Sequence, residues 1–122
     1  MPKVIHFDLT AENPQRAMDF YQQVFNWRFE KWDGPMEYWL IDAGPEEEEG
    51  IGGGLAQRTS PDDGTLNTIG VTSLDETLPL IMDNGGEVVR DKTAVPGVGW
   101  LAYCRDTEGN DFGVMELDPE AA

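Results

Sequence analysis

Cysteine and histidine are nearly absent from this chain of 122 residues, which has one of each, Cys104 and His6. A single cysteine excludes an internal disulfide and any metal cluster held by cysteines alone. Cys104 ends the apolar run that begins at Trp100. We therefore expect a buried, unreactive thiol rather than a nucleophile.

Long apolar runs are absent as well. No stretch approaches the ~20 residues of a membrane-spanning helix. The N-terminus does not show the apolar stretch of roughly 7–15 residues behind a basic start that marks a signal peptide. We expect a cytoplasmic protein with no membrane partner.

Positive charge is scarce, because eight lysines and arginines stand against 24 acids, for a formal net charge of −16. Such a chain repels the phosphates of nucleic acids and anionic lipid surfaces, so neither is an expected partner. Two explanations of the charge stay open. One is a solubilising surface, and the other is adaptation to high salt, where screening relieves the self-repulsion.

What is present is typical of a globular protein, with 39% hydrophobic and 10% aromatic residues. The length fits one domain over residues 1–122, because domains cluster near ~100–150 residues. In the first half, alternation predicts a strand, and Asn13 followed by Pro14 predicts a helix start. The predicted strands are Val4–Thr10, Trp27–Lys31, Glu37–Ala43 and Ile51–Gln57.

The second half repeats the apolar pattern of the first at an offset of 60 residues, which predicts two modules, 3–58 and 66–118, joined by a linker at 59–65. Ser73 begins a capping box for the second helix. Pro79 conflicts with a regular helix, so the helix either begins near Leu78 or is kinked. The predicted strands are Glu87–Arg90, Trp100–Arg105 and Phe112–Leu117.

Two segments carry a family resemblance. His6-Phe7-Asp8-Leu9 leads into Arg16-Ala17-Met18-Asp19-Phe20-Tyr21-Gln22-Gln23-Val24-Phe25-Asn26-Trp27, and Asp106-Thr107-Glu108-Gly109-Asn110 forms a late turn. The chain resembles the vicinal oxygen chelate superfamily, which includes glyoxalase I, bleomycin-resistance proteins and extradiol dioxygenases, although that family usually has proline in place of Thr107. The resemblance implies an α+β fold of two tandem βαβββ modules whose curved mixed sheets enclose a cavity. It also implies a homodimer.

The same resemblance implies four metal-ligand positions, which fall on His6, Gly53, Leu66 and Gly113. Only His6 has a donor atom, and one ligand holds a metal weakly. We therefore expect no cofactor and no resident metal, with a loosely held divalent ion as the remaining alternative. Glu116 does not replace Gly113, because an offset of three residues on a strand points to the opposite face.

The candidate site combines these positions with Asp8, which shares the face of His6, and with aromatic residues that alternation alone does not assign to a face. The predicted ligand-binding residues are His6, Asp8, Trp39, Gly53, Leu66, Trp100, Tyr103 and Gly113. His6 is also the candidate catalytic residue. A lone strand histidine is, however, more often a hydrogen-bonded structural group than a base.

Three functions remain open at this stage. The preferred one is binding of a small organic molecule in a metal-free cavity. The second is a glyoxalase-type lyase or isomerase that uses an atypical metal or His6 as general base. The third is a non-enzymatic interaction domain.

The charge pattern predicts that salt stabilises the protein. So many carboxylates with so few cations repel one another across the surface, and screening weakens that repulsion. Raising potassium chloride from low ionic strength toward molar should raise the melting temperature measured by calorimetry. A flat or falling curve would contradict this expectation.

Overall fold

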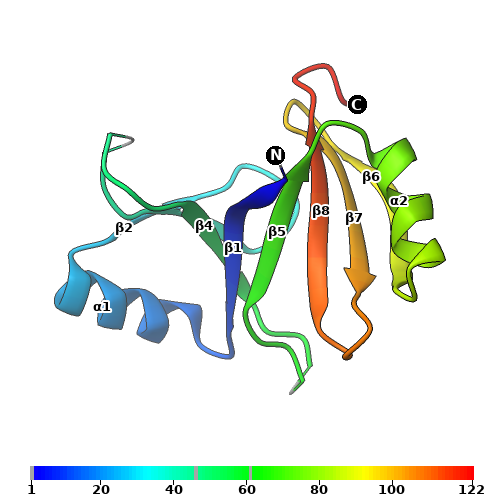
Figure 1. Cartoon of the computed structure of the whole chain (residues 1–122). Coiled ribbons are helices and arrows are strands. Elements are labelled where there is room, and N and C mark those ends of the chain that lie inside the picture. Colours follow the sequence, from blue (N-terminus) through cyan, green and yellow to red (C-terminus); the bar gives the residue numbers. More distant parts are fainter. Residues whose placement is uncertain (1, 46, 61) are drawn as a thin grey trace. The chain divides into compact units, whose positions relative to one another are not determined.

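The computed structural model describes residues 2–45, 47–60 and 62–122. It is an α+β fold of two helices and eight strands (Figure 1). The chain divides into two compact units, His6–Thr65 and Leu66–Ala122, and the latter includes the first residues up to Ile5. Each unit has the βαβββ element order that the sequence predicts.

The first unit is built from β1 (Lys3–Ala11), α1 (Pro14–Phe25), β2 (Arg28–Lys31), β3 (Tyr38–Asp42) and β4 (Gly52–Gln57). The strand order is β2-β3-β4-β1, with β1 parallel to β4 and the other pairs antiparallel. The predicted helix start is confirmed, because the Asn13 side chain accepts a hydrogen bond from the Arg16 amide at 3.1 Å. The helix ends at Asn26, whose φ of 62° is left-handed.

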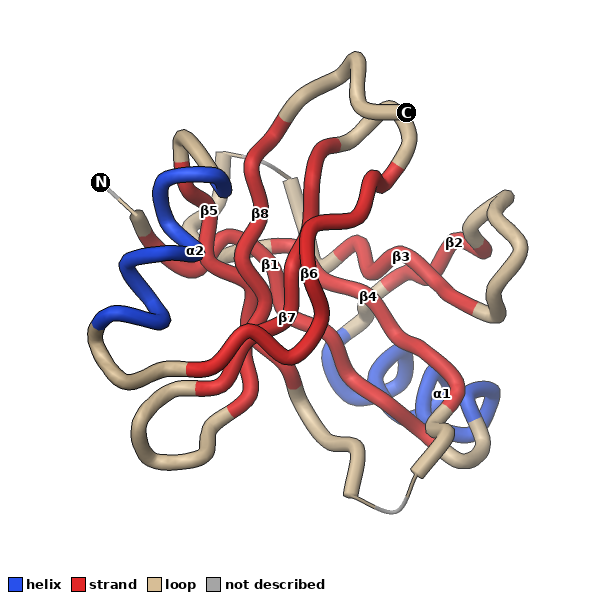
Figure 2. The backbone as a smooth tube through the Cα atoms, turned by 90° about the vertical axis from the view of Figure 1, so that its right-hand side faces the viewer, coloured by secondary structure: helices blue, strands red, loops and turns tan. Residues whose placement is uncertain are grey.

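One face of this sheet packs against α1, which lies along β3 and β4 in Figure 2. Aromatic rings pack together at the C-terminal end of α1, where Tyr21 stacks on Trp27 with ring centroids 5.0 Å apart. The apolar side chains that form this core are Phe7, Leu9, Met18, Trp27, Trp39, Ile41 and Leu55. The first core therefore covers the sheet face that carries Phe7, and the opposite face is not part of this core.

The second unit consists of β5 (Leu66–Val71), α2 (Leu74–Asp83), β6 (Glu87–Val95), β7 (Gly99–Arg105) and β8 (Asp111–Leu117), in the order β5-β8-β7-β6. α2 begins at Leu74, so the alternative start near Leu78 is wrong, and Pro79 lies inside the helix. Two side-chain hydrogen bonds stabilise the start of α2. Ser73 accepts from the Glu76 amide, and the Glu116 carboxylate accepts from the Leu74 amide at 2.9 Å.

The second core lies between α2 and its sheet, and its buried side chains are Leu74, Leu78, Ala102, Cys104 and Val114. Cys104 is 1% exposed, and burial raises the pKa of its thiol. A higher pKa lowers the thiolate fraction, so the expectation of a buried, unreactive cysteine is confirmed. Glu116 binds the start of α2, which also confirms that it points to the face opposite Gly113.

Residue 61 of the predicted linker, 59–65, lies outside the described residues. The Asp63 carboxylate accepts hydrogen bonds from the Thr59 amide and hydroxyl and from the Ser60 amide. These bonds, the Thr59 hydroxyl first, lower the pKa of Asp63. Among the described residues, neither helix has the length and apolar character needed to cross a bilayer.

The internal repeat slips by one residue in its last strand. Phe7 of β1 pairs with Gly53 of β4, whereas Thr68 of β5 pairs with Gly113 of β8. Phe7 corresponds to position 67 at an offset of 60, so the partner of Gly113 in the repeat is Gly54, which pairs with Asp8. The ungapped offset aligned Gly53 with Gly113, which is wrong by one residue. Because side chains alternate along a strand, the error assigned Gly53 to the wrong face of the sheet.

Candidate functional site

A cluster of three polar side chains lies on the face of the first unit's sheet that α1 does not cover. His6 and Asp8 come from β1 and Tyr38 comes from β3. Their neighbours in sequence, Phe7 and Trp39, pack in the core beside α1. Because successive side chains of a strand alternate between faces, the three polar residues share the other face.

The three side chains form a hydrogen-bonded triad. The Tyr38 hydroxyl donates to Asp8 Oδ1 at 2.6 Å. His6 Nε2 lies 3.2 Å from the same carboxylate oxygen and 3.0 Å from the Tyr38 hydroxyl oxygen. The His6 and Asp8 side chains are 33% and 23% exposed, so the triad is reachable from solvent. The short bond to an ionised acceptor is of the stronger class of hydrogen bond.

Tyr38 reaches Asp8 only because β4 carries a glycine between them. β4 pairs with β3 on one side and with β1 on the other, and Gly54 is the direct partner of Asp8. A Cβ atom built on Gly54 would overlap the Tyr38 hydroxyl and ring. The ring therefore passes over the bare backbone of β4, and glycine is required for that close approach.

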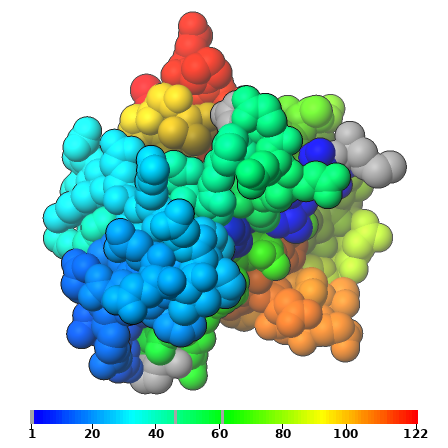
Figure 3. Space-filling view, turned by 90° about the vertical axis from the view of Figure 1, so that its left-hand side faces the viewer, coloured from blue at the N-terminus to red at the C-terminus, as the bar shows by residue number. Residues whose placement is uncertain are grey.

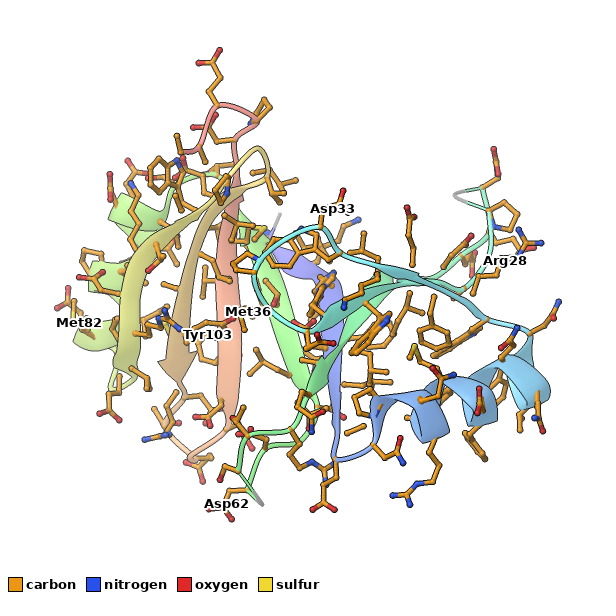
Figure 4. All side chains as sticks on the ribbon, turned by 180° about the vertical axis from the view of Figure 1, so that it is seen from behind. Arg28, Asp33, Met36, Asp62, Met82 and Tyr103 are labelled. Carbon is orange, nitrogen blue, oxygen red and sulfur yellow. The ribbon has the colours of Figure 1, made fainter. Side chains whose placement is uncertain are left out.

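Trp32 supports the tyrosine from the loop between β2 and β3, which Figure 4 shows with Asp33 and Met36 labelled. Its ring meets the Tyr38 ring edge to face, with centroids 6.1 Å apart and an interplanar angle of 81°. The Trp32 amide also donates to the Tyr38 carbonyl at 2.9 Å. A Cβ atom on Gly34 would overlap the indole, so this loop too has a glycine where a ring lies on its backbone.

The structure brings His6 and Asp8 together but places two other first-unit candidates elsewhere. Trp39 packs against the α1-side core. A Cβ atom on Gly53 would lie 2.6 Å from the Phe7 carbonyl oxygen and 2.7 Å from its ring, so Gly53 faces the core as well. Gly53 therefore offers no open space to a ligand, because the Phe7 ring lies against it.

The second unit divides its candidates in the same way. Trp100 packs against the α2-side core, donates to Asp118 at 3.2 Å and lies beneath the Lys92 ammonium at 4.9 Å. Tyr103 of β7, labelled in Figure 4, pairs with Gly113 of β8. Both positions alternate with buried residues of the α2-side core, so they lie on the sheet face opposite α2.

The glycine of that second face is also not a vacant position. A Cβ atom on Gly113 would meet the hydroxyl oxygen of Thr68, a buried residue, at 2.7 Å. Leu66 shares this face, two residues before Thr68 on β5, and it contributes no donor atom. The second unit thus presents a mostly apolar counterpart of the triad face.

Sequence reasoning missed Tyr38, Gly54 and Trp32 as parts of the site. Alternation predicts that Tyr38 and Trp39 point to opposite faces of the sheet, but it does not say which of the two rings faces the core. The run Gly52-Gly53-Gly54 contains the glycine that the tyrosine ring needs, but only the strand register identifies it as Gly54. An Asp or His beside a tyrosine two strands away leaves no local pattern, because the contact spans 30 residues.

The donor set does not fit a resident metal. His6 Nε2 already lies within hydrogen-bonding distance of two oxygens. The other implied positions are leucine and glycine, which have no ligating side chain. Within residues 2–45, 47–60 and 62–122, no group of three histidine, cysteine, aspartate or glutamate side chains gathers closely enough to hold an ion. We derive no chemistry through a metal here.

Comparison with known proteins gives a consistent result. The family model of the Glyoxalase/Bleomycin resistance protein/Dioxygenase superfamily matches residues 3–114. A comparison with curated proteins gave no match.

Among solved structures, a hypothetical protein from Bacillus halodurans is similar at a TM-score of 0.72 and 18% identity, over 99% of this chain and 98% of that one. Methylmalonyl-CoA epimerase from Mycobacterium tuberculosis is similar at 0.70 and 12%, over 95% and 88%. Streptomyces coelicolor methylmalonyl-CoA epimerase in complex with 2-nitronate-propionyl-CoA is similar at 0.68 and 13%, over 98% and 97%.

Alanine at Gly54 should destabilise the protein relative to alanine at Gly52. Both glycines are in β4, and a Cβ on Gly52 meets nothing within 4 Å, so Gly52→Ala controls for the change in backbone entropy. Gly54→Ala pushes the Tyr38 hydroxyl away from Asp8, and losing that bond should cost about 1–3 kcal/mol of unfolding free energy. Urea denaturation measures the difference. Equal stabilities would show that the triad is not held over Gly54.

Proposed function

Since the chain belongs to the Glyoxalase/Bleomycin resistance protein/Dioxygenase superfamily, we propose that it binds a small organic molecule without a resident metal ion. The His6–Asp8–Tyr38 triad on the open face of the first unit is the observation that carries this proposal. It supplies directional polar atoms next to Gly54, Leu40 and Ala56 on the same face. Small-molecule sites commonly have this composition.

The triad is not a requirement of the fold, because the second unit does without it. By register, the positions equivalent to His6 and Asp8 are Leu66 and Thr68, and the position equivalent to Tyr38 is Leu101. The same βαβββ framework thus forms with two leucines and a threonine. Polar side chains that a fold can omit, kept half-buried at a desolvation cost, support a binding role.

The CoA-linked chemistry of the similar epimerases is not part of the proposal. The complexed Streptomyces coelicolor enzyme binds 2-nitronate-propionyl-CoA, whose CoA portion carries several phosphate charges. A chain of net charge −16 repels such a polyanion at long range. Likeness below 20% identity supports the shared fold and does not carry the substrate.

A proton-transfer enzyme of the lyase or isomerase type is the second candidate, and one observation favours it. Asp8 lies 3.2 Å from one ring nitrogen of His6, which is the arrangement by which a carboxylate orients an imidazole for general-base work. His6 would be the base, with Asp8 and Tyr38 orienting it. A ligand whose carbon-bound hydrogen exchanges with solvent deuterium in a His6-dependent way would favour this candidate.

The binding proposal predicts a ligand whose effect depends on the triad. A thermal-shift screen of small organic molecules should find at least one that raises the melting temperature saturably, as selective binding to the folded state requires. His6→Ala, Asp8→Asn and Tyr38→Phe should weaken that binding by about tenfold each. Glu30→Gln is the control, since it removes one exposed acid from β2 of the same unit.

Three outcomes would contradict the proposal. The screen could find no ligand, or the triad variants could bind a ligand as tightly as the parent protein does. Elemental analysis of dialysed protein could also find close to one transition metal per chain, which would contradict the metal-free site.

We also propose a homodimer, supported by exposed apolar side chains on α1. Phe20, Val24 and Phe25 are each 56% exposed, and α1 lies at the front of the face shown in Figure 3. Apolar side chains gathered on one helix face favour association. Light scattering at micromolar concentration should give twice the chain mass, more completely at higher salt because charge repulsion is screened. A monomer at every ionic strength would contradict this.

A further inference from the structure

The hydrogen bonds of the triad determine which ring nitrogen of neutral His6 carries the proton. A tyrosine hydroxyl has one proton, and at 2.6 Å the Tyr38 proton is donated to Asp8. Asp8 Oδ1 is the acceptor of that bond and contributes no proton to it. His6 Nε2 faces that carboxylate oxygen at 3.2 Å and the tyrosine oxygen at 3.0 Å. A nitrogen lone pair there would oppose two oxygen lone pairs, whereas an N–H satisfies both.

We infer that the triad holds His6 as the Nε2–H tautomer, so that Nδ1 is the hydrogen-bond acceptor that the site presents to its ligand, and that the ligand is an amine. Tyr38 is then a positioning residue, because its hydroxyl donates its proton to Asp8 and its oxygen accepts from the imidazole. The assignment of the tautomer stands on the contacts alone. The assignment of the ligand class rests on the proposed binding function of this face.

Nδ1 is open to such a ligand. Within the described part of the chain, both hydrogen-bond contacts of the His6 ring are made by Nε2. The His6 side chain is 33% exposed, and no side-chain nitrogen or oxygen is buried without a partner among the described residues. A neutral imidazole has one donor and one acceptor nitrogen, so with Nε2 donating inward the outward nitrogen accepts.

Charge and ring geometry select the class of donor. The acceptor nitrogen belongs to a ring that touches the Asp8 carboxylate, in a chain of net charge −16, so the surrounding potential favours a cation over an anion. Trp32, whose ring contacts Tyr38, adds an indole that can lie against a cation or an apolar body. A protonated amine on an aromatic or aliphatic body can donate to the acceptor nitrogen, is attracted by the negative potential and can lie against the indole. A carboxylate or phosphate has no proton to donate and is repelled by the potential.

The tautomer can be tested without any ligand, because the chain contains a single histidine. Long-range ¹H–¹⁵N correlation spectra of protein labelled at the imidazole show only His6, and a pH series identifies its neutral form. In that form Nε2 should have the shift of a protonated nitrogen and Nδ1 that of a lone-pair nitrogen. The reverse assignment, or a rapidly averaged mixture like that of free histidine, would overturn the inference.

Two variants separate positioning from a merely structural role. Tyr38→Phe and Asp8→Asn should each move the neutral His6 toward the averaged tautomer mixture, a spectroscopic change that loss of stability alone does not produce. Tyr21→Phe removes a hydroxyl from α1, which covers the other face of the same sheet, and should leave the His6 spectrum unchanged. A parent-like tautomer in both triad variants would overturn the role assigned to Tyr38 and Asp8.

The ligand class is tested with benzylamine and benzoate, which share a ring and differ in the sign of their charge. Benzylamine should shift the His6 Nδ1 resonance saturably, with binding about tenfold weaker in Asp8→Asn, and benzoate should leave it unchanged. Benzoate binding as well as benzylamine, or neither probe reaching His6, would overturn the amine assignment. Failure of the binding proposal itself is read separately, from the absence of any screened ligand that perturbs His6.

Discussion

The candidate site depends on the hydrogen bond between the Tyr38 hydroxyl and the Asp8 carboxylate. This bond joins β3 to β1 across the intervening β4, at 2.6 Å. A ring that crosses a strand needs backbone without a side chain beneath it, which explains Gly54. The ring then offers an edge for Trp32 and an oxygen for His6. Three residues from two strands, β1 and β3, thereby form one polar cluster.

A second constraint is the excess of negative charge. Of the cations in the described part of the chain, Lys31, Lys92 and Arg105 form ion pairs with nearby acids. These pairs are exposed, and exposed pairs contribute little to stability. The fold therefore depends on its two apolar cores and on hydrogen-bonded turns while its surface repels itself. The same excess favours cationic ligands over anionic ones at the triad, which links the charge composition to the choice of partner.

Local sequence signals predicted the framework of this fold. Asn13 and Pro14 located the first helix, and Ser73 located the second, because caps act over three or four residues. Strand limits agreed within one or two residues, except that β6 continues to Val95 beyond the predicted end at Arg90. Pro79 shows the limit of such rules, since the packing of Leu74 and Leu78 and the bond from Glu116 keep α2 helical around it.

The site was less predictable because it depends on register. His6 and Asp8 share a face by simple alternation, and the structure confirms that they are neighbours. Choosing Tyr38 over Trp39 needed the knowledge of which ring enters the core. Choosing Gly54 over Gly53 needed the pairing of β4 with β1, which the ungapped repeat missed by one residue. A slip of one residue reverses the face of every side chain in a strand, which explains the wrong choice of glycine.

The central claim is that Asp8 and Tyr38 act as one coupled unit, and a double-mutant cycle measures that coupling directly. Urea denaturation of the parent protein, Asp8→Asn, Tyr38→Phe and the double variant gives the interaction free energy free of each residue's other contacts. A charge-assisted hydrogen bond between half-buried groups predicts a coupling of about 1–3 kcal/mol in favour of the parent pair. Additive effects, with a coupling near zero, would contradict the account.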